Sequence, residues 1–286
     1  MNSKKILITG AHGQLGSALS GLLQSTPYNV VCTDYDSLDI TNSEAVESFI
    51  GEGKFDYIVN CAAYTQVDRA EEDADNSDLL NHIAVANIAN AALNCGGRVI
   101  HISTDYVFDG NHFVPYVESD EPAPRSVYGS TKLAGERDLF GIAPDSIVVR
   151  TAWLYSATGN NFVKTMLRLG KEKDSIRVVY DQIGSPTYAP DLASAILTII
   201  ESKTWVPGVY HFTNEGVISW YDFAKAIFRI SGVHCEVSPI LSSEYKTLAV
   251  RPHYSVLDKS KIKSVFGVNI PYWEDSLQLC IKLLNK

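Results

Sequence analysis

A tyrosine and a lysine stand four residues apart in the segment SVYGSTKLAGE, at Tyr128 and Lys132. Side chains at this spacing share one face of an α-helix, so the two could act together. A phenol has an ordinary pKa of about 10, and lowering it by about 3 units requires roughly 4 kcal/mol in favour of the phenolate. One ammonium group at about 4 Å supplies roughly that much at intermediate dielectric. The pair could therefore protonate a carbonyl oxygen while a hydride reaches the carbonyl carbon from the opposite side.

The same spacing occurs a second time, at Tyr221 and Lys225 in WYDFAKAI, so spacing alone does not identify a catalytic pair. The helix that carries Tyr128 follows the predicted strand RVIHIST, which ends at Thr104. Ligands of open α/β sheets bind at the carboxyl ends of the strands. No comparable hydroxyl or glycine loop stands near Tyr221. We therefore expect Thr104, Tyr128 and Lys132 to be catalytic, and the second pair to be packing, with a semi-buried tyrosine and a solvated lysine.

A glycine-rich loop, ITGAHGQLG, lies between the first predicted strand and the first predicted helix. Gly10 permits a sharp turn, Gly13 lets a pyrophosphate approach the backbone, and Gly16 lets the helix lie close to the sheet. The anion would lie at the helix N-terminus, where backbone N–H groups are unpaired. This context predicts dinucleotide binding; the alternative is a purely structural turn.

An acidic residue, Asp34, follows the second predicted strand. A carboxylate at this place accepts hydrogen bonds from the adenosine ribose hydroxyls and repels a 2′-phosphate. No arginine stands beside it, so the sequence favours NADH over NADPH. Asp36 and Asp39 are close enough to take the same role, and a solvated strand end is the alternative for Asp34.

The composition is that of an ordinary globular protein, with 286 residues, 45% hydrophobic and 20% charged. The net charge of −9 argues against a broad electrostatic footprint on nucleic acid or an anionic membrane. The five cysteines are scattered and form no C-x-x-C pair, which is typical of free thiols in a reducing compartment. The start MNSKKILITG has too short an apolar run for a secretory signal, so we expect a cytoplasmic protein.

Strand-like and helix-like segments alternate through the first 150 residues, which predicts a doubly wound, Rossmann-like parallel sheet. The expected strands are 4–9, 28–34, 55–63, 98–104 and 145–153, and the expected helices are 13–24, 43–53, a long pattern ending at 97, and 126–140. Later helices are expected at 160–170, 191–202, 220–232 and near 273–285, around a turn-rich segment at 176–190. We expect a dinucleotide-binding domain at 1–155 and a smaller, interleaved α/β substrate-binding lobe at 156–286.

With ITGAHGQLG, NCAAYTQVDRAE, HISTDYVFDG and the Tyr128-x-x-x-Lys132 pair in order, the chain resembles the extended short-chain dehydrogenases/reductases. The later segments VVRTAWLYS, NNFVKTML, DQIGSPTYAPDLA and RPHYSVLD extend the resemblance to nearly the whole chain, within the branch that reduces keto sugars on nucleotides. The resemblance implies hydride transfer from NADH or NADPH to C4 of dTDP-4-dehydro-L-rhamnose, giving dTDP-L-rhamnose. The partner is then a small nucleotide sugar, with no nucleic acid or membrane.

The resemblance also implies roles at matching positions. Thr104 would hydrogen-bond the sugar 4-oxygen, Tyr128 would protonate it, and Lys132 would hold the nicotinamide ribose and lower the pKa of the tyrosine. The implied cofactor-binding residues are Gly10, Gly13, Gln14, Leu15, Gly16, Asp34, Asp39, Ile40, Ala62, Ala63, Tyr64, Tyr128 and Lys132. The implied substrate-binding residues are Val67, Thr104, Asp105, Trp153, Asn161 and Arg251. Core packing is the alternative for Trp153, and a surface salt bridge is the alternative for Arg251.

The sequence departs from the wider group at two places. Ala18 and Pro190 stand where some members carry acidic residues that bind magnesium at a dimer interface, so we expect no such metal site, and a monomer or weak homodimer. Asp105 and Tyr106 follow Thr104 where sugar dehydratases carry an Asp-Glu pair, so the acid/base pair for elimination is incomplete. Two alternatives stay open: a reductase or epimerase of another nucleotide sugar, and a non-catalytic NAD(P)-binding regulatory subunit.

Overall fold

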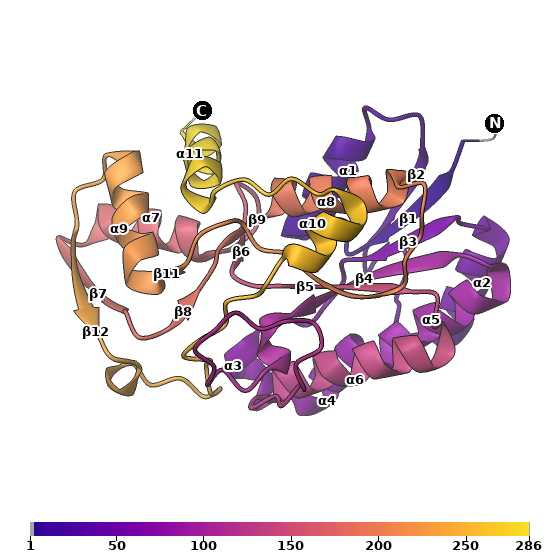
Figure 1. Ribbon diagram of the computed structural model, residues 1–286, viewed down its shortest axis with the longest axis horizontal. Coiled ribbons are helices and arrows are strands. Elements are labelled where there is room, and N and C mark those ends of the chain that lie inside the picture. The colour runs from indigo at the N-terminus through magenta and orange to yellow at the C-terminus, as the bar shows by residue number, and fades with distance from the viewer. Residues whose placement is uncertain (1–2, 286) are drawn as a thin grey trace.

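A parallel sheet forms the centre of the larger lobe (Figure 1). The computed structural model describes residues 3–285, and within them six strands pair in the order β10-β5-β4-β3-β1-β2, each pairing parallel. The strands are β1 (Lys5–Thr9), β2 (Asn29–Thr33), β3 (Tyr57–Asn60), β4 (Arg98–Thr104), β5 (Ile147–Thr151) and β10 (Gly208–His211). Every residue of β3 and β5 is buried, as apolar strands covered on both faces should be. The predicted Rossmann-like fold is confirmed.

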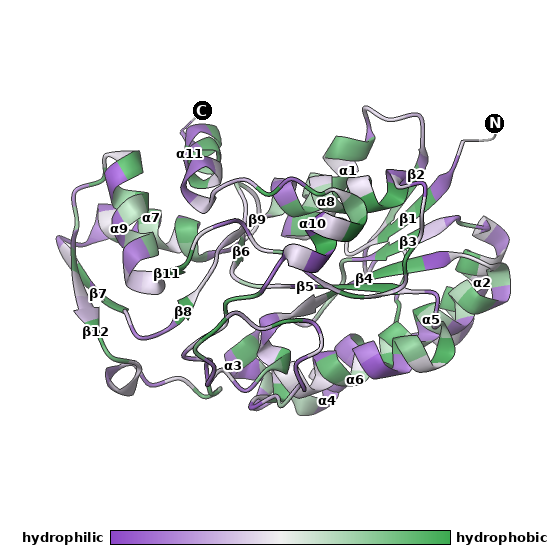
Figure 2. Ribbon diagram, viewed as in Figure 1, coloured by the Kyte–Doolittle hydropathy of each residue, from purple (hydrophilic) through white to green (hydrophobic). Residues whose placement is uncertain are grey.

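Helices cover both faces of this sheet. One face packs on α1 (Gln14–Leu23), α8 (Ala189–Glu201) and α10 (Ser260–Phe266), and the other on α2 (Ser43–Gly53), α5 (Ala84–Cys95) and α6 (Val127–Ile142). In Figure 2 the hydrophobic colour follows the central strands and parts of the helices around them. Leu192, Ile196 and Ile199 repeat at helical spacing along α8 and are all buried, which explains why this later helix packs on the first core.

The sheet reverses its strand order at β1, which lies between β2 and β3. The register pairs Thr9 with Asn60, and farther along the sheet Thr104 with Thr151, so these strand ends lie on one edge. In a doubly wound sheet this switch point opens a crevice at the carboxyl edge. The fold therefore places the predicted site residues of β1, β3 and β4 at one edge.

The smaller lobe packs around its own core. Its elements are β6 (Leu154–Tyr155), α7 (Phe162–Glu172), β7 (Ser175–Val179), β8 (Ile183–Gly184), β9 (Thr187–Tyr188), β11 (Ile218–Ser219), α9 (Trp220–Ser231), β12 (Glu236–Ile240), the 3-10 turn η3 (Ser242–Glu244) and α11 (Trp273–Leu284). Three two-stranded pairs, β7 with β12, β6 with β9 and β8 with β11, join these helices. The expected helices of this half are present, whereas the β7–β12 pair was not predicted, because its two strands are distant in sequence.

The two lobes share the second half of the chain. β10, α8 and α10 come after residue 155 but complete the sheet and core of the larger lobe. The division into 1–155 and 156–286 therefore stays an approximate prediction of two interleaved parts.

The single long helix predicted to end near residue 97 is divided in the structure. It consists of α3 (Val67–Ala70), α4 (Ala74–Asp78), a π-helical turn η1 (Leu79–Ile83) and α5. A π-helical turn inside a helix often marks a functional site, because its extra residue redirects a side chain.

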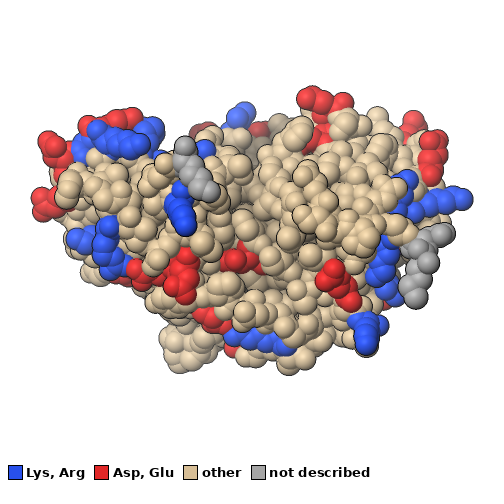
Figure 3. Space-filling view, turned by 90° about the horizontal axis from the view of Figure 1, so that it is seen from above, with Lys and Arg blue, Asp and Glu red and all other residues tan. Residues whose placement is uncertain are grey.

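Charged side chains of both signs are interspersed at the ends and rim of the face shown in Figure 3, and neither sign forms a continuous patch there. Among residues 3–285, no helix combines the length and the apolar character needed to cross a membrane.

Candidate active site

A cavity of about 1260 Å³ opens at the carboxyl edge of the sheet. Sites for drug-sized ligands are commonly about 300–1,000 Å³, so this one has room for a dinucleotide and part of a second ligand. It brings together most of the predicted site residues: Gly10, Gly13, Gln14, Leu15, Asp34, Asp39, Ile40, Ala62, Ala63, Tyr64, Val67, Thr104, Asp105, Tyr128, Lys132 and Trp153. Gly16, Asn161 and Arg251 lie outside the lining that the described residues form.

The glycine loop has the geometry of an anion cradle. Gly10 has a φ of 62°, and a Cβ there would lie 2.7 Å from the backbone nitrogen of Ala62. A Cβ at Gly16 would lie 2.2 Å from the carbonyl oxygen of Gly10, so only glycine lets α1 begin this close to the loop. Gly13 precedes α1 without a side-chain cap within the described chain, which leaves the first N–H groups of the helix for a ligand. The loop therefore fits the pyrophosphate of a dinucleotide.

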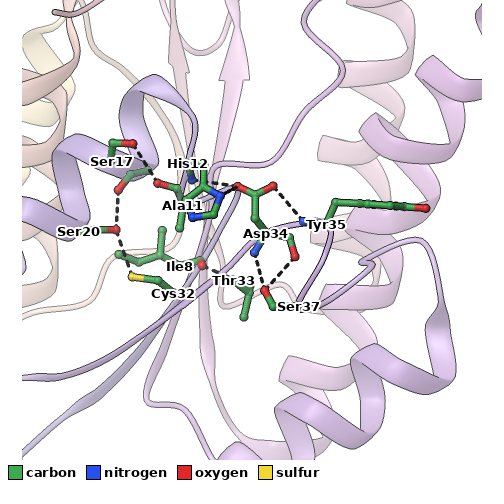
Figure 4. Close-up of polar contacts among 11 residues, drawn as sticks. Ile8, Ala11, His12, Ser17, Ser20, Cys32, Thr33, Asp34, Tyr35 and Ser37 are labelled. Carbon is green, nitrogen blue, oxygen red and sulfur yellow. Dashed lines mark hydrogen bonds and ion pairs between the residues drawn. The ribbon is translucent and has the colours of Figure 1, made fainter. Parts of the chain in front are cut away.

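Asp34 follows β2 at the same cavity, beside His12 (Figure 4). One carboxylate oxygen accepts from the backbone N–H of His12 at 2.9 Å, and the other accepts from the N–H of Tyr35 at 2.9 Å. The imidazole Nδ1 of His12 lies 3.5 Å from the carboxylate. Each oxygen keeps a lone pair for a further donor, so Asp34 is placed to accept from ribose hydroxyls.

Thr104 and Tyr128 both line the cavity. Burial raises the pKa of Tyr128 above its ordinary value, and the nearby Thr104 side chain opposes this shift. The Thr104 hydroxyl donates to Asp105 Oδ1 at 3.0 Å and accepts from the N–H of Tyr106 at 3.2 Å. These contacts fix the threonine at the start of the 3-10 turn η2 (Asp105–Val107) that follows β4.

Helix α6 brings Tyr128 to this edge because its glycines allow close packing. Ser126 caps the helix by accepting from the N–H of Gly129 at 3.1 Å. A Cβ at Gly129 would lie 2.2 Å from the carbonyl oxygen of Tyr106, and a Cβ at Gly135 would lie 2.2 Å from that of Asn81. A larger residue at either position would push the helix, and Tyr128 with it, away from the backbone of Tyr106 or Asn81.

Lys132 differs from the expectation. Its Nζ donates to the carbonyl oxygen of Ile102 at 2.7 Å and lies 3.1 Å from Nε2 of His101. Burial lowers the pKa of Lys132 to about 8, while Glu136 and Cys61 oppose the shift. The predicted lowering of the pKa of Tyr128 by this lysine is not met in the structure, because burial raises that pKa and Nζ of Lys132 is directed to His101 and Ile102.

Asp105 is an unusual carboxyl group, only 2% exposed and without a hydrogen-bond partner for Oδ2 among the described residues. Burial raises its pKa to about 6, although the nearby hydroxyl groups of Ser255 and Thr104 oppose the shift. It lies in the cavity wall next to Thr104. The site can therefore hold this carboxyl group close to its titration point near neutral pH.

Trp153 lines the cavity in a strained backbone conformation, with a φ of 50°. A non-glycine residue in this region costs about 1–3 kcal/mol and is commonly found at functional sites. Its ring stacks on Trp220, with 3.6 Å between the centroids and 13° between the planes. Trp220 also lines the cavity, and sequence reasoning missed it because it begins a helix of the smaller lobe. Its only sequence signal was an aromatic residue at the start of that helix.

Asn161 and Gln14 join the two lobes. The Asn161 amide donates to Gln14 Oε1 at 2.9 Å and to the carbonyl oxygen of Ser156 at 2.8 Å, while its own oxygen caps α7. The neighbouring Gly159 and Asn160 line the cavity instead. A direct substrate contact by Asn161 stays a prediction, and its observed contacts shape the cavity wall.

Arg251 is half-buried and forms an ion pair with Asp68 at 2.6 Å. A longer contact of 3.4 Å joins it to the hydroxyl of Tyr106, whose ring lies edge-on to that of Tyr128. The salt-bridge alternative therefore describes this arrangement, and diphosphate binding by Arg251 stays a prediction.

The π-helical turn η1 explains how Tyr64 is placed. Its Asn81 accepts from the backbone N–H of Tyr64 at 2.9 Å and donates to the carbonyl oxygen of Tyr64 at 3.1 Å. The Tyr64 hydroxyl donates to Asp73 at 2.9 Å. Asn81 was missed because an asparagine inside a helical pattern carries no distinctive signal.

At the two places considered for a metal, Ala18 packs partly buried on the larger core and Pro190 lies in the first turn of α8. Within residues 3–285 no group of three or more His, Cys, Asp and Glu side chains is arranged to hold a metal ion.

Known proteins are similar to this chain along its whole length. The model described as RmlD substrate binding domain matches residues 4–286. A dTDP-4-dehydrorhamnose reductase of Aggregatibacter actinomycetemcomitans is 45% identical over 285 residues, covering 96% of this chain and 97% of the relative. The crystal structure of a dTDP-4-dehydrorhamnose reductase from Clostridium acetobutylicum is 45% identical with a TM-score of 0.96, covering 99% and 100% of the two chains.

A second solved structure, the dTDP-4-dehydrorhamnose reductase of Bacillus anthracis in complex with NADP, is 41% identical with a TM-score of 0.95, covering 99% of this chain and 100% of the other. Both the sequence and the fold are therefore shared over nearly the full length. The chain belongs to the family of the dTDP-4-dehydrorhamnose reductases, whose model is described as the RmlD substrate binding domain.

Proposed function

We propose that this protein is an NAD(P)H-dependent reductase that converts dTDP-4-dehydro-L-rhamnose to dTDP-L-rhamnose. The observation that carries the proposal is the meeting of Thr104 and Tyr128 at the end of β4, inside a cavity that also contains the glycine loop. A hydroxyl and a phenol in this arrangement can hold and protonate one carbonyl oxygen. The names of the relatives supply the identity of the sugar and of the nucleotide.

The residues of the chain divide the work between binding and proton transfer. The glycine loop and the N-terminus of α1 bind the pyrophosphate, and Asp34 binds the ribose hydroxyls of the adenosine. When bound, the reduced nicotinamide supplies a hydride to C4 of the sugar. Thr104 orients the 4-oxygen by a hydrogen bond, and the Tyr128 O–H bond breaks to deliver its proton to that oxygen. The tyrosinate then regains a proton from solvent, so one hydride and one proton are consumed for each ketone reduced.

Trp153 supports the sugar in this proposal. The flat face of an aromatic ring suits the apolar face of a pyranose, and the ring of Trp220 behind it keeps Trp153 in place. The strained φ of Trp153 then has a function, because it turns the indole into the cavity.

Either nicotinamide cofactor fits the proposal. Asp34 favours NADH, because a carboxylate repels a 2′-phosphate. The exposed imidazole of His12 beside that carboxylate offers a donor for a phosphate, and the Bacillus anthracis relative was solved with NADP. The preference for NADH therefore stays a prediction.

The alternatives are supported less well. A regulatory subunit would need no proton donor, whereas the chain keeps Thr104, Tyr128 and Lys132 together in one cavity. An epimerase is less well supported because the relatives of 45% identity are named as reductases. We also propose that the enzyme works in the cytoplasm as a monomer or weak homodimer. The cytoplasmic location is supported by its five cysteines, all within the described residues and all free.

A turnover assay tests the function directly. Purified protein is mixed with dTDP-4-dehydro-L-rhamnose and either NADH or NADPH, and the absorbance of the reduced nicotinamide is followed. We expect a loss of absorbance that depends on the sugar, together with dTDP-L-rhamnose as product. Loss of absorbance only with a different 4-keto nucleotide sugar would redirect the proposal to another substrate.

A further inference from the structure

A chain of buried polar side chains lies behind the lysine of the proposed site. Thr9 Oγ1 donates to Asn60 Oδ1 at 2.7 Å, Asn60 Nδ2 lies 3.0 Å from His101 Nδ1, and His101 Nε2 lies 3.1 Å from Lys132 Nζ. All four side chains are at most 1% exposed. We call this set the Thr9–Lys132 chain. It crosses β1, β3 and β4 to reach α6, so each member is held by a different element.

The backbone fixes the orientation of Asn60 at the centre of this chain. Its Oδ1 also faces the backbone N–H of Ala62 at 3.2 Å, and a backbone N–H can only donate. Rotating the amide by half a turn would place its NH₂ group against that N–H. The amide nitrogen therefore points to His101, where it donates to Nδ1.

The orientation of Asn60 decides which nitrogen of His101 carries the proton. Burial holds the pKa of His101 well below its ordinary value, so the ring is neutral and has one proton. Because Nδ1 accepts from Asn60, that proton must be on Nε2. The N–H bond of Nε2 then points at Lys132 Nζ.

An ammonium group has no lone pair and cannot accept this proton, whereas a neutral amine can. The same Nζ donates to the carbonyl oxygen of Ile102 at 2.7 Å, which a neutral amine also allows. The charged or titratable groups around the lysine are few: Glu136, which Arg150 binds through two nitrogens, and Cys61, whose pKa burial raises to about 12. The contacts are thus mutually consistent when the amine is neutral.

We propose that His101 is a positioning residue, oriented by Asn60 to donate its Nε2 proton to Lys132 and to favour the neutral amine in the free enzyme. Protonation of the lysine then requires His101 to move its proton to Nδ1, against the fixed amide of Asn60. The lysine is consequently held near its titration point, where cofactor or substrate can shift it.

The kinetic consequence rests on the proposed function. If the ammonium form of Lys132 supports the tyrosinate, kcat/KM falls as pH rises through the titration of the lysine. The pH at which kcat/KM falls, called here the basic limb of the pH profile, then depends on the His101 tautomer. Neither His101 nor Asn60 contacts the reacting atoms in this proposal.

The tautomer can be measured in the unmodified protein. A long-range proton–nitrogen correlation spectrum of ¹⁵N-histidine-labelled protein reports which ring nitrogen carries the proton, and His101→Phe assigns the signal. We expect the proton on Nε2. A proton on Nδ1 would overturn the proposal. This readout needs no turnover, so its failure is distinguishable from failure of the reductase assay.

Two variants test the link to the lysine. In Asn60→Asp the carboxylate accepts from Nδ1–H and from Ala62, so we expect the proton on Nδ1 and a basic limb shifted upward by about one pH unit. In Thr9→Val the N–H of Ala62 still holds the amide oxygen, so the proton should stay on Nε2 and the limb should not move. An unchanged limb in a folded Asn60→Asp protein whose tautomer has switched would contradict the coupling. If that variant does not fold, the wild-type spectrum decides.

Discussion

Helices α6 and α9 carry the same Tyr-x-x-x-Lys spacing, and both begin at a capping serine, yet their surroundings differ. Lys132 is 1% exposed and Tyr128 lines the cavity, whereas Lys225 is exposed and Tyr221 packs partly buried on the core of the smaller lobe. The prediction that the second pair is packing is confirmed. The comparison teaches that a local spacing acquires chemistry from the edge of the sheet at which its helix begins, and not from the helix itself.

The largest effect should come from the two tyrosines. Tyr128→Phe removes the proton donor and should lower kcat by about 10²–10⁴-fold, the usual contribution of a general acid. Tyr221→Phe should leave kcat within twofold. Both rates are measured with saturating cofactor by the loss of nicotinamide absorbance, and binding of NADPH to each variant is checked by fluorescence titration. Comparable losses in both variants would abolish the distinction between the two helices.

The two lysines should differ next most strongly. Lys132→Met should lower kcat by roughly 10²-fold, or about 2.7 kcal/mol of transition-state stabilisation, because the buried amine no longer supports Tyr128 or the ribose. Lys225→Met should change neither kcat nor, beyond about 0.5 kcal/mol, the free energy of unfolding, as is usual for an exposed side chain. A fully active Lys132→Met protein would remove the lysine from the proposed site.

The buried carboxyl group beside the first pair should make the stability of the protein depend on pH. Burial raises the pKa of Asp105 from 3.8 to about 6, so between these values the folded state binds more protons than the unfolded state. The free energy of unfolding therefore falls as pH rises through that window, by on the order of 3 kcal/mol. Asp105→Asn should remove this loss and stabilise the protein at pH 7, but give little gain at pH 4.

Asp222 in the capping box of α9 is the matched control. Asp222→Asn should lower the free energy of unfolding at pH 7 by about 0.5 kcal/mol, since the amide loses the attraction of a carboxylate to the helix N-terminus. Urea unfolding of both variants at pH 4 and pH 7 measures the effects. Destabilisation by Asp105→Asn at pH 7 would contradict the account of its burial.

The smallest kinetic effect concerns Trp220, where α9 reaches the cavity. Trp220→Ala removes the ring on which Trp153 stacks, and should raise KM for the sugar nucleotide by about 3- to 10-fold, in keeping with the ~0.5–1.5 kcal/mol of an aromatic pair. We expect kcat to change less than twofold, because Trp220 supports a binding surface and takes no part in proton transfer. Steady-state kinetics separates the two parameters. A large loss of kcat with unchanged KM would give α9 a chemical role.

The sequence predicted the fold of the first 155 residues well, because apolar strand segments alternate there with helical segments. It did not predict β10, which joins the sheet beside β5 after a long excursion through the smaller lobe. Trp220 was missed for the same reason, since only the folded chain brings α9 to the cavity. Distant contacts of this kind leave no local pattern.

The contacts of Lys132 show a second limit. The spacing to Tyr128 was visible in the sequence, but His101 and Asn60 determine where the amine points, and they come from two other strands. The spacing along a helix predicts on which face of the helix a side chain lies. The hydrogen-bond partners of that side chain depend on how the neighbouring strands and helices pack against it.

The central claim is that the cavity at the end of β4 delivers a hydride to the carbonyl carbon whose oxygen Thr104 and Tyr128 hold. The most direct measurement uses NADPH deuterated at both C4 positions of its nicotinamide, with dTDP-4-dehydro-L-rhamnose and the wild-type protein. NMR of the product should show one deuterium at C4 of dTDP-L-rhamnose and none elsewhere on the sugar. A product without deuterium at C4, or deuterium at another carbon, would contradict the account.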